Sequence, residues 1–321
     1  MKGATVISLG SINADFQVRV NHPVGSSDML QASQFERFSG GKSANTAFLA
    51  ARLGHRSVLL GRVGDDELAQ QALDPLADAG VNVSGVTRAS GKPTGLSMIL
   101  VPPDCKKHIA LAPNANDSWD EEAIALIEQR ISRVSKPACL IINYEIPAPV
   151  VRRAVEAAGK QGLPVILDPS FADRVERTLL RQMHCITPNV TETAGLVGRN
   201  VKSVSEAAGA AAELRNSGVQ LVCVKLGDGG CVLASRDELI HIPAAQVDVS
   251  DTTGAGDAFT TALAVALLED RSPREAAAWG VASANLAVTG YGSQAAYAER
   301  RQIIDLAENL LAGAEVIDVR T

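Results

Sequence analysis

Short runs of β-branched and aliphatic residues alternate with longer helix-periodic segments along most of the chain, and this alternation constrains the fold more than any other feature. Strand and helix in strict succession indicate right-handed βαβ crossovers, which build a parallel sheet. We therefore expect an α/β fold, with a doubly wound, mostly parallel sheet flanked by helices. The expected strands are Val6–Gly10, Ser57–Gly61, Leu140–Asn143, Val165–Asp168, Ile186–Pro188 and Leu221–Lys225. The expected helices are Ser43–Leu53, Glu67–Ala79, Glu121–Arg130, Pro149–Lys160 and Ser205–Asn216.

The composition agrees with this expectation and excludes several classes of protein. Hydrophobic residues make up 46% of the 321 residues and charged residues 21%, which is ordinary globular usage and argues against disorder. Aromatic residues make up only 3%, so small and branched side chains must fill the core, as suits helices packed closely on a sheet. The net charge of −6 argues against a protein that binds nucleic acid.

The cysteines and the N-terminal segment indicate the compartment. The five cysteines form no CxxC pair and show no metal-ligand spacing with the five histidines, which is typical of reduced core thiols in a cytosolic protein. Val6–Gly10 is too short for the apolar region of a signal peptide, and no apolar run approaches the roughly 18 residues of a membrane span. We expect a cytoplasmic protein that contacts no membrane.

Some segments depart from the α/β rhythm, because polar and apolar residues alternate along them. They are Phe16–Val20, Gln34–Phe38, Leu96–Val101 and Lys107–Leu111. Such alternation indicates half-exposed antiparallel strands. It fits a small antiparallel sheet over one edge of the main sheet, and it fits ordinary surface hairpins equally well. Since no linker-like tract or repeat divides the chain, we expect one domain over residues 1–321, with a lid formed by about 13–39 and 94–112.

The strongest chemical signal lies in the segment 251–259, which reads Asp-Thr-Thr-Gly-Ala-Gly-Asp-Ala-Phe and precedes an apolar helix. Two glycines and an alanine at a helix entrance let backbone N–H groups converge at the positive end of the helix dipole, which makes an anion-binding site. Asp257 could instead serve only as a helix cap. A cap does not explain the Gly-Ala-Gly run, Asp251 and two threonines, so we favour the anion-binding site.

A second glycine-rich segment, 39–46, reads Ser-Gly-Gly-Lys-Ser-Ala-Asn-Thr and opens a helix. It is not a P-loop, because Glu36 stands where the GxxxxGK[ST] pattern requires glycine, and no GxGxxG fingerprint follows the first strand. Bare glycine backbone, a cation and an amide within a few residues could hold a polyhydroxylated ligand. A glycine turn before a capped helix with a solvated lysine is the alternative, which this segment alone slightly favours.

These two segments and four others, taken in order, resemble the motifs of the ribokinase-like (PfkB) carbohydrate kinases, and the resemblance covers nearly the whole chain. The other four are Gly10–Asp15, Asn143–Pro147, Thr187–Glu192 and Val224–Gly230. The resemblance implies a ribokinase-like fold, ATP as phosphoryl donor, Mg²⁺ and a small sugar as acceptor. It also implies a lid that closes over the sugar and pairs between subunits, so we expect a homodimer formed through the lid.

The resemblance also assigns roles to individual residues. Asp257 would accept the proton of the attacking sugar hydroxyl, late in the transfer because a carboxylate at a helix N-terminus is a weak base. The N–H groups of Gly254, Ala255 and Gly256 would hold the charge on the transferred phosphoryl group. The sugar-binding residues would be Asn13, Asp15, Gly41, Lys42, Asn45, Glu145 and Asp257. The nucleotide- and phosphate-binding residues would be Asn189, Glu192, Lys225, Gly227, Asp228, Gly229, Gly230 and Gly256.

Two metal sites follow from the same resemblance. Asn189 and Glu192 would place Mg²⁺ through water, since this ion keeps much of its hydration shell. A K⁺ site would use carbonyl oxygens of Asp251, Thr253, Ala287, Gly290 and Gly292. The chain departs from the family at two points: Ala296 replaces a serine at the end of the K⁺ site, and Val281 replaces an asparagine or histidine near adenine. Asn285, one helical turn further on, is expected either to lie near adenine or to pack between helices.

The implied activity is ATP-dependent transfer of the γ-phosphoryl group to a sugar hydroxyl, with D-ribose converted to ribose 5-phosphate as the first choice. Fructokinase, 2-keto-3-deoxygluconate kinase and nucleoside kinase are alternatives. The low aromatic content argues against the last, because nucleoside kinases of this fold stack the base on aromatic rings. A non-catalytic sugar or nucleotide sensor is disfavoured, because Asp257 and the glycines before it are present.

Overall fold

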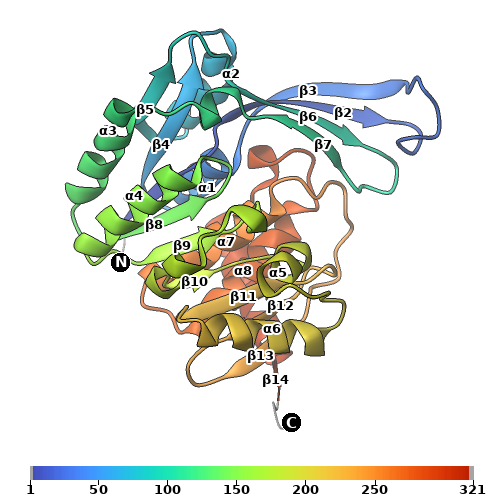
Figure 1. Cartoon of the computed structure of the whole chain (residues 1–321). Coiled ribbons are helices and arrows are strands. Elements are labelled where there is room, and N and C mark those ends of the chain that lie inside the picture. The colour runs from blue at the N-terminus through green and yellow to red at the C-terminus, as the bar shows by residue number, and fades with distance from the viewer. Residues whose placement is uncertain (1–2, 318–321) are drawn as a thin grey trace.

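The computed structural model describes residues 3–317, and its main layer is a ten-stranded sheet of order β14-β13-β12-β11-β10-β9-β8-β1-β4-β5 (Figure 1). Neighbouring strands pair in parallel from β5 through β4, β1, β8, β9 and β10 to β11. Beyond β11, the strands β12, β13 and β14 follow at one edge, and their pairing is antiparallel. The expected doubly wound, mostly parallel sheet is confirmed. Its strands are β1 (Thr5–Leu9), β4 (Arg56–Gly64), β5 (Asn82–Ala89), β8 (Ala138–Asn143), β9 (Val165–Asp168), β10 (Cys185–Ile186), β11 (Leu221–Lys225), β12 (Cys231–Ala234), β13 (Leu239–Ile242) and β14 (Glu315–Val316).

Helices cover both faces of this sheet. One face is covered by α3, α4, α5 and α6, and the other by α1, α7, α8 and α9, while α2 packs beside α1 over β4. The helices are α1 (Lys42–Arg52), α2 (Leu68–Asp78), α3 (Glu121–Ser132), α4 (Ala148–Lys160), α5 (Val190–Val197), α6 (Val204–Asn216), α7 (Ala255–Leu268), α8 (Pro273–Ala287) and α9 (Arg300–Ala312). Short 3₁₀ turns lie at Asn114–Asp117, Ala172–Arg174, Arg177–Gln182 and Gln294–Ala296. No helix within residues 3–317 has both the length and the apolar character needed to cross a bilayer.

The central strands show why their sequence is apolar without interruption. Along β8, Leu140 and Ile142 pack in the core with α3 to α6, whereas Cys139 and Ile141 pack in the core with α1 and α7 to α9. Successive side chains of a strand point to opposite faces, so a strand covered on both faces needs apolar residues at every position. The buried thiols of Cys139, Cys185, Cys223 and Cys231 belong to this core, as expected, whereas Cys105 is partly exposed.

A second sheet stands apart from the main one, and Figure 1 shows it projecting at the upper right. Its order is β3-β2-β6-β7. The strands are β2 (Asn13–Val20), β3 (Ala32–Gly40), β6 (Gly95–Val101) and β7 (His108–Ala112), which lie in the ranges expected for the lid. The structure thus confirms a separate sheet and rules out the alternative of ordinary surface hairpins.

The pairing within the second sheet differs in one respect from a wholly antiparallel arrangement. The outer pairs, β2 with β3 and β6 with β7, are antiparallel, but the central strands β2 and β6 run parallel. The reason is topological. Strand β2 continues from β1 and strand β6 from β5, and both of those lie in the parallel part of the main sheet, so both chains leave it in the same direction.

Several elements were not predicted from the sequence. They include β5, the antiparallel strands β12 to β14 and the helices α5 and α9. The strand expected at Ile186–Pro188 is shorter and earlier, because β10 spans only Cys185–Ile186 before the chain turns into α5. The strands β5 and β14 lie at the two edges of the sheet, and β10 to β14 are each five residues or shorter, which leaves little hydrophobic pattern to recognise.

Candidate active site

A cavity of about 650 Å³ lies between the carboxyl ends of the parallel strands and the inner side of the second sheet. Ligands of open α/β sheets bind at this end of the strands, because the loops and helix N-termini meet there. The residues predicted for catalysis, sugar binding and nucleotide binding all line this cavity: Asn13, Asp15, Gly41, Lys42, Asn45, Glu145, Asn189, Glu192, Lys225, Gly227, Asp228, Gly229, Gly230, Gly254, Ala255, Gly256 and Asp257.

The N-terminus of α7 has the geometry that the Gly-Ala-Gly run predicts. Gly254 is the residue before the helix and has a φ of 76°, in the left-handed region that favours glycine. A Cβ atom at Gly254 would lie 2.7 Å from both the Ser293 Cβ and the Tyr297 hydroxyl. That hydroxyl donates to the Gly254 carbonyl at 3.1 Å. The Tyr297 hydroxyl therefore holds the segment Gly254–Gly256 on the side away from the cavity. The N–H groups of this segment face the cavity, and so does Asp257 in the first turn of α7.

The N-terminus of α1 is built in the same way. Gly41 has a φ of 90°, and a Cβ atom there would lie 2.6 Å from the Ser11 carbonyl oxygen. The Ser11 hydroxyl accepts from the Lys42 backbone N–H at 2.9 Å, and the Ser11 carbonyl accepts from the Ser43 N–H at 3.2 Å. This close approach of β1 and α1 requires glycine and turns the Lys42 and Asn45 side chains toward α7.

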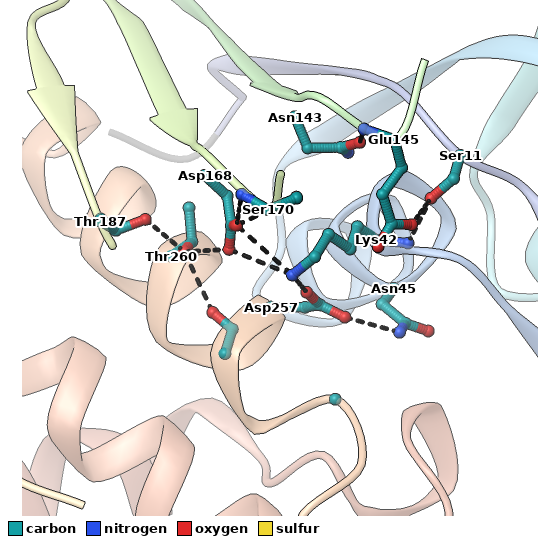
Figure 2. A network of polar contacts seen from close by, with 12 residues as sticks. Ser11, Lys42, Asn45, Asn143, Glu145, Asp168, Ser170, Thr187, Asp257 and Thr260 are labelled. Atoms are coloured by element: carbon teal, nitrogen blue, oxygen red, sulfur yellow. Dashed lines mark hydrogen bonds and ion pairs between the residues drawn. The ribbon is translucent and has the colours of Figure 1, made fainter. Parts of the chain in front are cut away.

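Two lysines and two aspartates form a charged network between these helix ends, and Figure 2 shows its members Lys42, Asp168 and Asp257. The Lys42 Nζ lies 3.2 Å from Asp257 Oδ1 and 3.4 Å from Asp168, and the Lys225 Nζ lies 3.1 Å from Asp168 Oδ2. Burial alone would raise the pKa of Asp168, but the two ammonium groups hold it at about 2. Burial alone would lower the pKa of Lys42, but Asp168 and Asp257 hold it well above its ordinary value. Lys42 therefore stays charged inside the cavity.

The Asp257 carboxylate is oriented by a chain of amide contacts. The Asn45 Nδ2 donates to Asp257 Oδ2 at 2.8 Å. The Asn45 Oδ1 in turn accepts from Gln294 Nε2 at 3.1 Å and from the Ser293 hydroxyl at 3.2 Å. Because both ends of the Asn45 amide are engaged, this residue can offer only its N–H to Asp257. The carboxylate is thereby held next to the anion-binding turn.

Polar groups of the second sheet and of β8 form the other end of the cavity. The Asn13 Oδ1 accepts from Asn116 Nδ2 at 2.8 Å, and its Nδ2 donates to the Ser97 hydroxyl at 3.2 Å. The Ser11 hydroxyl donates to Glu145 Oε2 at 2.5 Å, as Figure 2 shows. These contacts fix the direction in which the Asn13 and Glu145 side chains face the cavity.

At the buried carboxylate of Asp15, the loss of contact with water is not offset by hydrogen bonds to both oxygens. Its Oδ1 is buried and has no hydrogen-bond partner among the described residues. Burial raises the pKa of Asp15 to about 7; Ser97 opposes the rise, and the Glu145 carboxylate adds to it. Burial also raises the pKa of Glu145, with Lys42 opposing. A carboxylate in this state is ready to accept hydrogen bonds from a hydroxylated ligand.

The opposite end of the cavity carries the residues predicted for nucleotide binding. Asn189 and Glu192 cap α5 reciprocally: the Asn189 Oδ1 accepts from the Glu192 N–H at 2.9 Å, and Glu192 Oε2 accepts from the Asn189 N–H at 2.7 Å. Burial and the nearby Asp168 raise the pKa of Glu192, with Lys225 opposing. The capping box uses one oxygen of Glu192, so the other remains for a cation or its water shell.

The residues near the expected adenine site have different roles. Val281 is fully buried in the core formed with α7 and α9 and is not among the residues that line the cavity. Asn285 lines the cavity, but its Oδ1 accepts from the Ala245 N–H at 2.7 Å and its Nδ2 donates to the Gly229 carbonyl at 2.9 Å. Asn285 therefore ties two loops together, and the surface beside it is formed by Val247, Val249 and Val288.

The residues expected to hold K⁺ lie behind the anion-binding turn. Asp251 is fully buried and accepts from the Thr253 N–H at 2.9 Å, the Thr253 hydroxyl at 2.7 Å and the Gly292 N–H at 3.0 Å. Among residues 3–317, no donor reaches the carbonyl oxygens of Asp251, Thr253, Gly290 or Gly292. Unpaired carbonyl oxygens beside a buried carboxylate fit a monovalent cation.

Two residues of the site were missed by the sequence analysis. Asp168 ends β9 and joins Lys42 to Lys225, and its place at the carboxyl end of a predicted buried strand was an available signal. Lys107 precedes β7 and reaches the cavity, where its Nζ donates to the Thr252 carbonyl at 3.1 Å. Nothing in the local sequence distinguishes Lys107 from the neighbouring Lys106.

The fold and the paired helix ends are those of a sugar kinase, and comparison with known proteins gives the same result. The sequence profile of the pfkB family carbohydrate kinases matches residues 4–300, and the chain belongs to this family. Ribokinase of Haemophilus influenzae is 31% identical over 305 residues, which cover 95% of this chain and 99% of that protein. Deoxyribokinase of Salmonella typhi is 29% identical over 290 residues, which cover 90% and 94%.

A solved structure extends the comparison. Arabidopsis thaliana ribokinase complexed with ribose and ATP is 30% identical and superimposes with a TM-score of 0.79, over 96% of this chain and 99% of that one. The present chain is therefore an ATP-dependent carbohydrate kinase with a ribokinase-like fold.

Proposed function

We propose that this enzyme transfers the γ-phosphoryl group of ATP to D-ribose and forms ribose 5-phosphate. The observation that carries the proposal is the set of polar side chains Asn13, Asp15, Asn45 and Glu145, which line the same cavity as Asp257. Amides and carboxylates with fixed directions suit a small ligand that has a hydroxyl group on nearly every carbon. The likeness to a ribokinase that binds ribose and ATP supports the same assignment.

In this proposal Asp257 accepts the proton of the attacking hydroxyl. Its Oδ2 is held by Asn45, and Lys42 lies 3.2 Å from its Oδ1. The N–H groups of Gly254, Ala255 and Gly256 bind the charge that develops on the transferred phosphoryl group, and Lys225 adds a positive charge beside Gly256. Phosphoryl transfer needs positioning and charge stabilisation more than covalent participation, and this arrangement supplies both.

Two cations belong to the proposal. Mg²⁺ is held by Asn189 and Glu192 through water and neutralises phosphate charge when bound. K⁺ is held by carbonyl oxygens of Asp251, Thr253, Ala287, Gly290 and Gly292, behind the anion-binding turn. The unpaired carbonyl oxygens of Asp251, Thr253, Gly290 and Gly292 and the free oxygen of Glu192 support these placements. The Ala287 carbonyl differs, because it already accepts from the Gly290 N–H at 3.4 Å.

Among other acceptors, 2-deoxyribose is the strongest rival, because a deoxyribokinase relative is nearly as similar to this chain as a ribokinase is. Fructose and 2-keto-3-deoxygluconate follow. A nucleoside is disfavoured, because Ile99, Ile109 and Leu111 face the cavity from the second sheet and offer a base no ring on which to stack.

We further propose that the second sheet acts as a lid of a one-domain, cytoplasmic homodimer. Its outer side is apolar: Phe16 and Phe35 stack at 6.1 Å between ring centroids, and Met98 stands directly opposite Phe16 on β6. Phe35 is 53% exposed and Met98 is 55% exposed. A sheet face of this kind is usually covered, and the same face of a second copy would cover it.

A coupled assay of ADP release tests the acceptor. It compares ribose, 2-deoxyribose, fructose, 2-keto-3-deoxygluconate and adenosine, each with K⁺ and with Na⁺. We expect the highest kcat/KM with ribose and a lower rate when Na⁺ replaces K⁺. A higher kcat/KM with any other acceptor would replace ribose in the proposal, and equal rates with both cations would remove the K⁺ site.

A further inference from the structure

Three side chains of the second sheet contact three consecutive residues of the loop that leads into the anion-binding turn. The Arg19 guanidinium donates to the Ser250 carbonyl at 3.2 Å, and the Gln17 Nε2 donates to Asp251 Oδ2 at 2.5 Å. The Lys107 Nζ donates to the Thr252 carbonyl at 3.1 Å. Arg19 and Gln17 lie in β2 and Lys107 directly precedes β7, so both halves of the sheet hold the same loop.

The contact at Asp251 reaches the centre of the site. Gln17 and Asp251 are both fully buried, and a hydrogen bond to a carboxylate is strong where water is excluded. The same carboxylate accepts from the N–H groups of Thr253 and Gly292 and so sets the course of the chain into Gly254. A shift of Gln17 would therefore move the turn whose N–H groups face the phosphoryl group.

The same strand carries the sugar-facing residues. Side chains alternate along β2, so Asn13, Asp15, Gln17 and Arg19 all point to the inner side. The first two line the polar end of the cavity, and the last two hold the loop at Ser250 and Asp251. A strand paired on both sides moves as a unit, so a sugar bound to Asn13 and Asp15 would also fix the position of Gln17 and Arg19.

We propose that Gln17 and Lys107 are positioning residues that couple sugar binding under the second sheet to formation of the anion-binding turn at Gly254–Gly256. The inference rests on the proposed placement of sugar and nucleotide in the cavity, and not on which sugar is the substrate. The coupling is reciprocal: sugar strengthens nucleotide binding, and nucleotide strengthens sugar binding by the same factor.

Calorimetry measures this coupling directly. The affinity for a non-hydrolysable ATP analogue with Mg²⁺ is determined with and without the sugar that the wild-type enzyme phosphorylates best, so failure of ribose as substrate does not affect the test. In the wild type we expect sugar to tighten nucleotide binding by about fivefold or more. In Lys107→Met we expect that ratio to fall to within about twofold of unity, because the ammonium group that holds Thr252 is removed.

Matched variants separate coupling from general damage. Lys106→Met changes the adjacent lysine, which is exposed and whose side chain makes no contact with the loop among the described residues, and it should keep the wild-type ratio. Lys107→Arg keeps a donor at the same place and should restore most of the ratio. Gln17→Leu removes the buried contact to Asp251 and should lose the ratio while each ligand still binds alone.

The outcomes are distinct. An unchanged ratio in both Lys107→Met and Gln17→Leu, or a wild type without coupling, would overturn the inference. Hydrogen exchange adds a second readout: sugar should protect the amides of residues 252–256 in the wild type and in Lys106→Met, but not in Lys107→Met. Equal protection in all three proteins would also overturn it.

Discussion

Replacing Asp257 by asparagine removes the proposed base while leaving the shape of the site almost unchanged. The Asn45 Oδ1 is already held by Gln294 and Ser293, so the Asn45 amide cannot turn. The new side chain must therefore direct its oxygen to Asn45 and its NH₂ to the Lys42 ammonium, where a donor meets a donor. Lys42 keeps its contact with Asp168 at 3.4 Å, so the network loses one interaction and the fold is preserved.

The size of the expected effect follows from these contacts. A positioned general base contributes roughly 100- to 10,000-fold to the rate, and each factor of ten corresponds to about 1.4 kcal/mol of activation free energy. We therefore expect kcat to fall by roughly 100- to 10,000-fold, which is about 3 to 5 kcal/mol. The loss of the Lys42 contact should lower the free energy of unfolding by only about 1 to 3 kcal/mol.

The assay measures kcat by coupled ADP release at saturating sugar and ATP, and the Kd of each ligand by calorimetry. Both Kd values should stay within about tenfold of the wild type. Asp120→Asn is the control, because Asp120 caps α3 outside the cavity and asparagine caps a helix equally well. A kcat for Asp257→Asn within tenfold of the wild type would refute the role as base, and a Kd for sugar that rises as much as kcat falls would make Asp257 a sugar-binding residue instead.

Three further predictions follow. Between about pH 4 and 7 the folded protein holds a proton on Asp15 that the unfolded chain has released, so the contribution of Asp15 to stability falls as pH rises; Asp15→Asn should raise the melting temperature at pH 8 and not at pH 4. An equal change at both pH values would contradict this. The pKa of Asp168 is lowered to about 2, so its contribution is present above about pH 4 and lost as pH falls toward 2; in urea at pH 7, Asp168→Asn should lower the free energy of unfolding by about 2 kcal/mol. An unchanged urea midpoint would count against the charged network. Met98→Glu should halve the apparent mass in size-exclusion chromatography, and a mass equal to that of the wild type would argue against a dimer formed through the second sheet.

The sequence predicted the parts of the site that depend on backbone geometry. Gly254 before α7 and the di-glycine Gly40–Gly41 before α1 stand where φ is positive or where a Cβ atom would meet another chain segment. Such positions exclude nearly every residue except glycine, so they are visible in a single sequence. The four alternating segments likewise indicated half-exposed strands, because each strand has one inner and one outer side, but only the resemblance to the family favoured a sheet over surface hairpins.

The sequence did not predict contacts between side chains that are distant along the chain. Asp168 joins Lys42 to Lys225 only because β9 lies between β8 and β11 in the order of the sheet. Asn285 was expected beside adenine or in helix packing, and the structure shows it tying Gly229 to Ala245. Residue type and spacing cannot reveal such partners, because an asparagine or aspartate serves many partners equally well.

What the sequence determined by itself was the alternation of strands and helices, the helix entrances that need glycine and the family to which the chain belongs. The tertiary structure alone decided which charges meet. Lys42 pairs with Asp168 and Asp257, Lys107 reaches Thr252, and the buried Asp15 Oδ1 has no hydrogen-bond partner within residues 3–317. The physical reason is that local backbone preferences act within a few residues, whereas burial and charge depend on segments that only the packed sheets bring together.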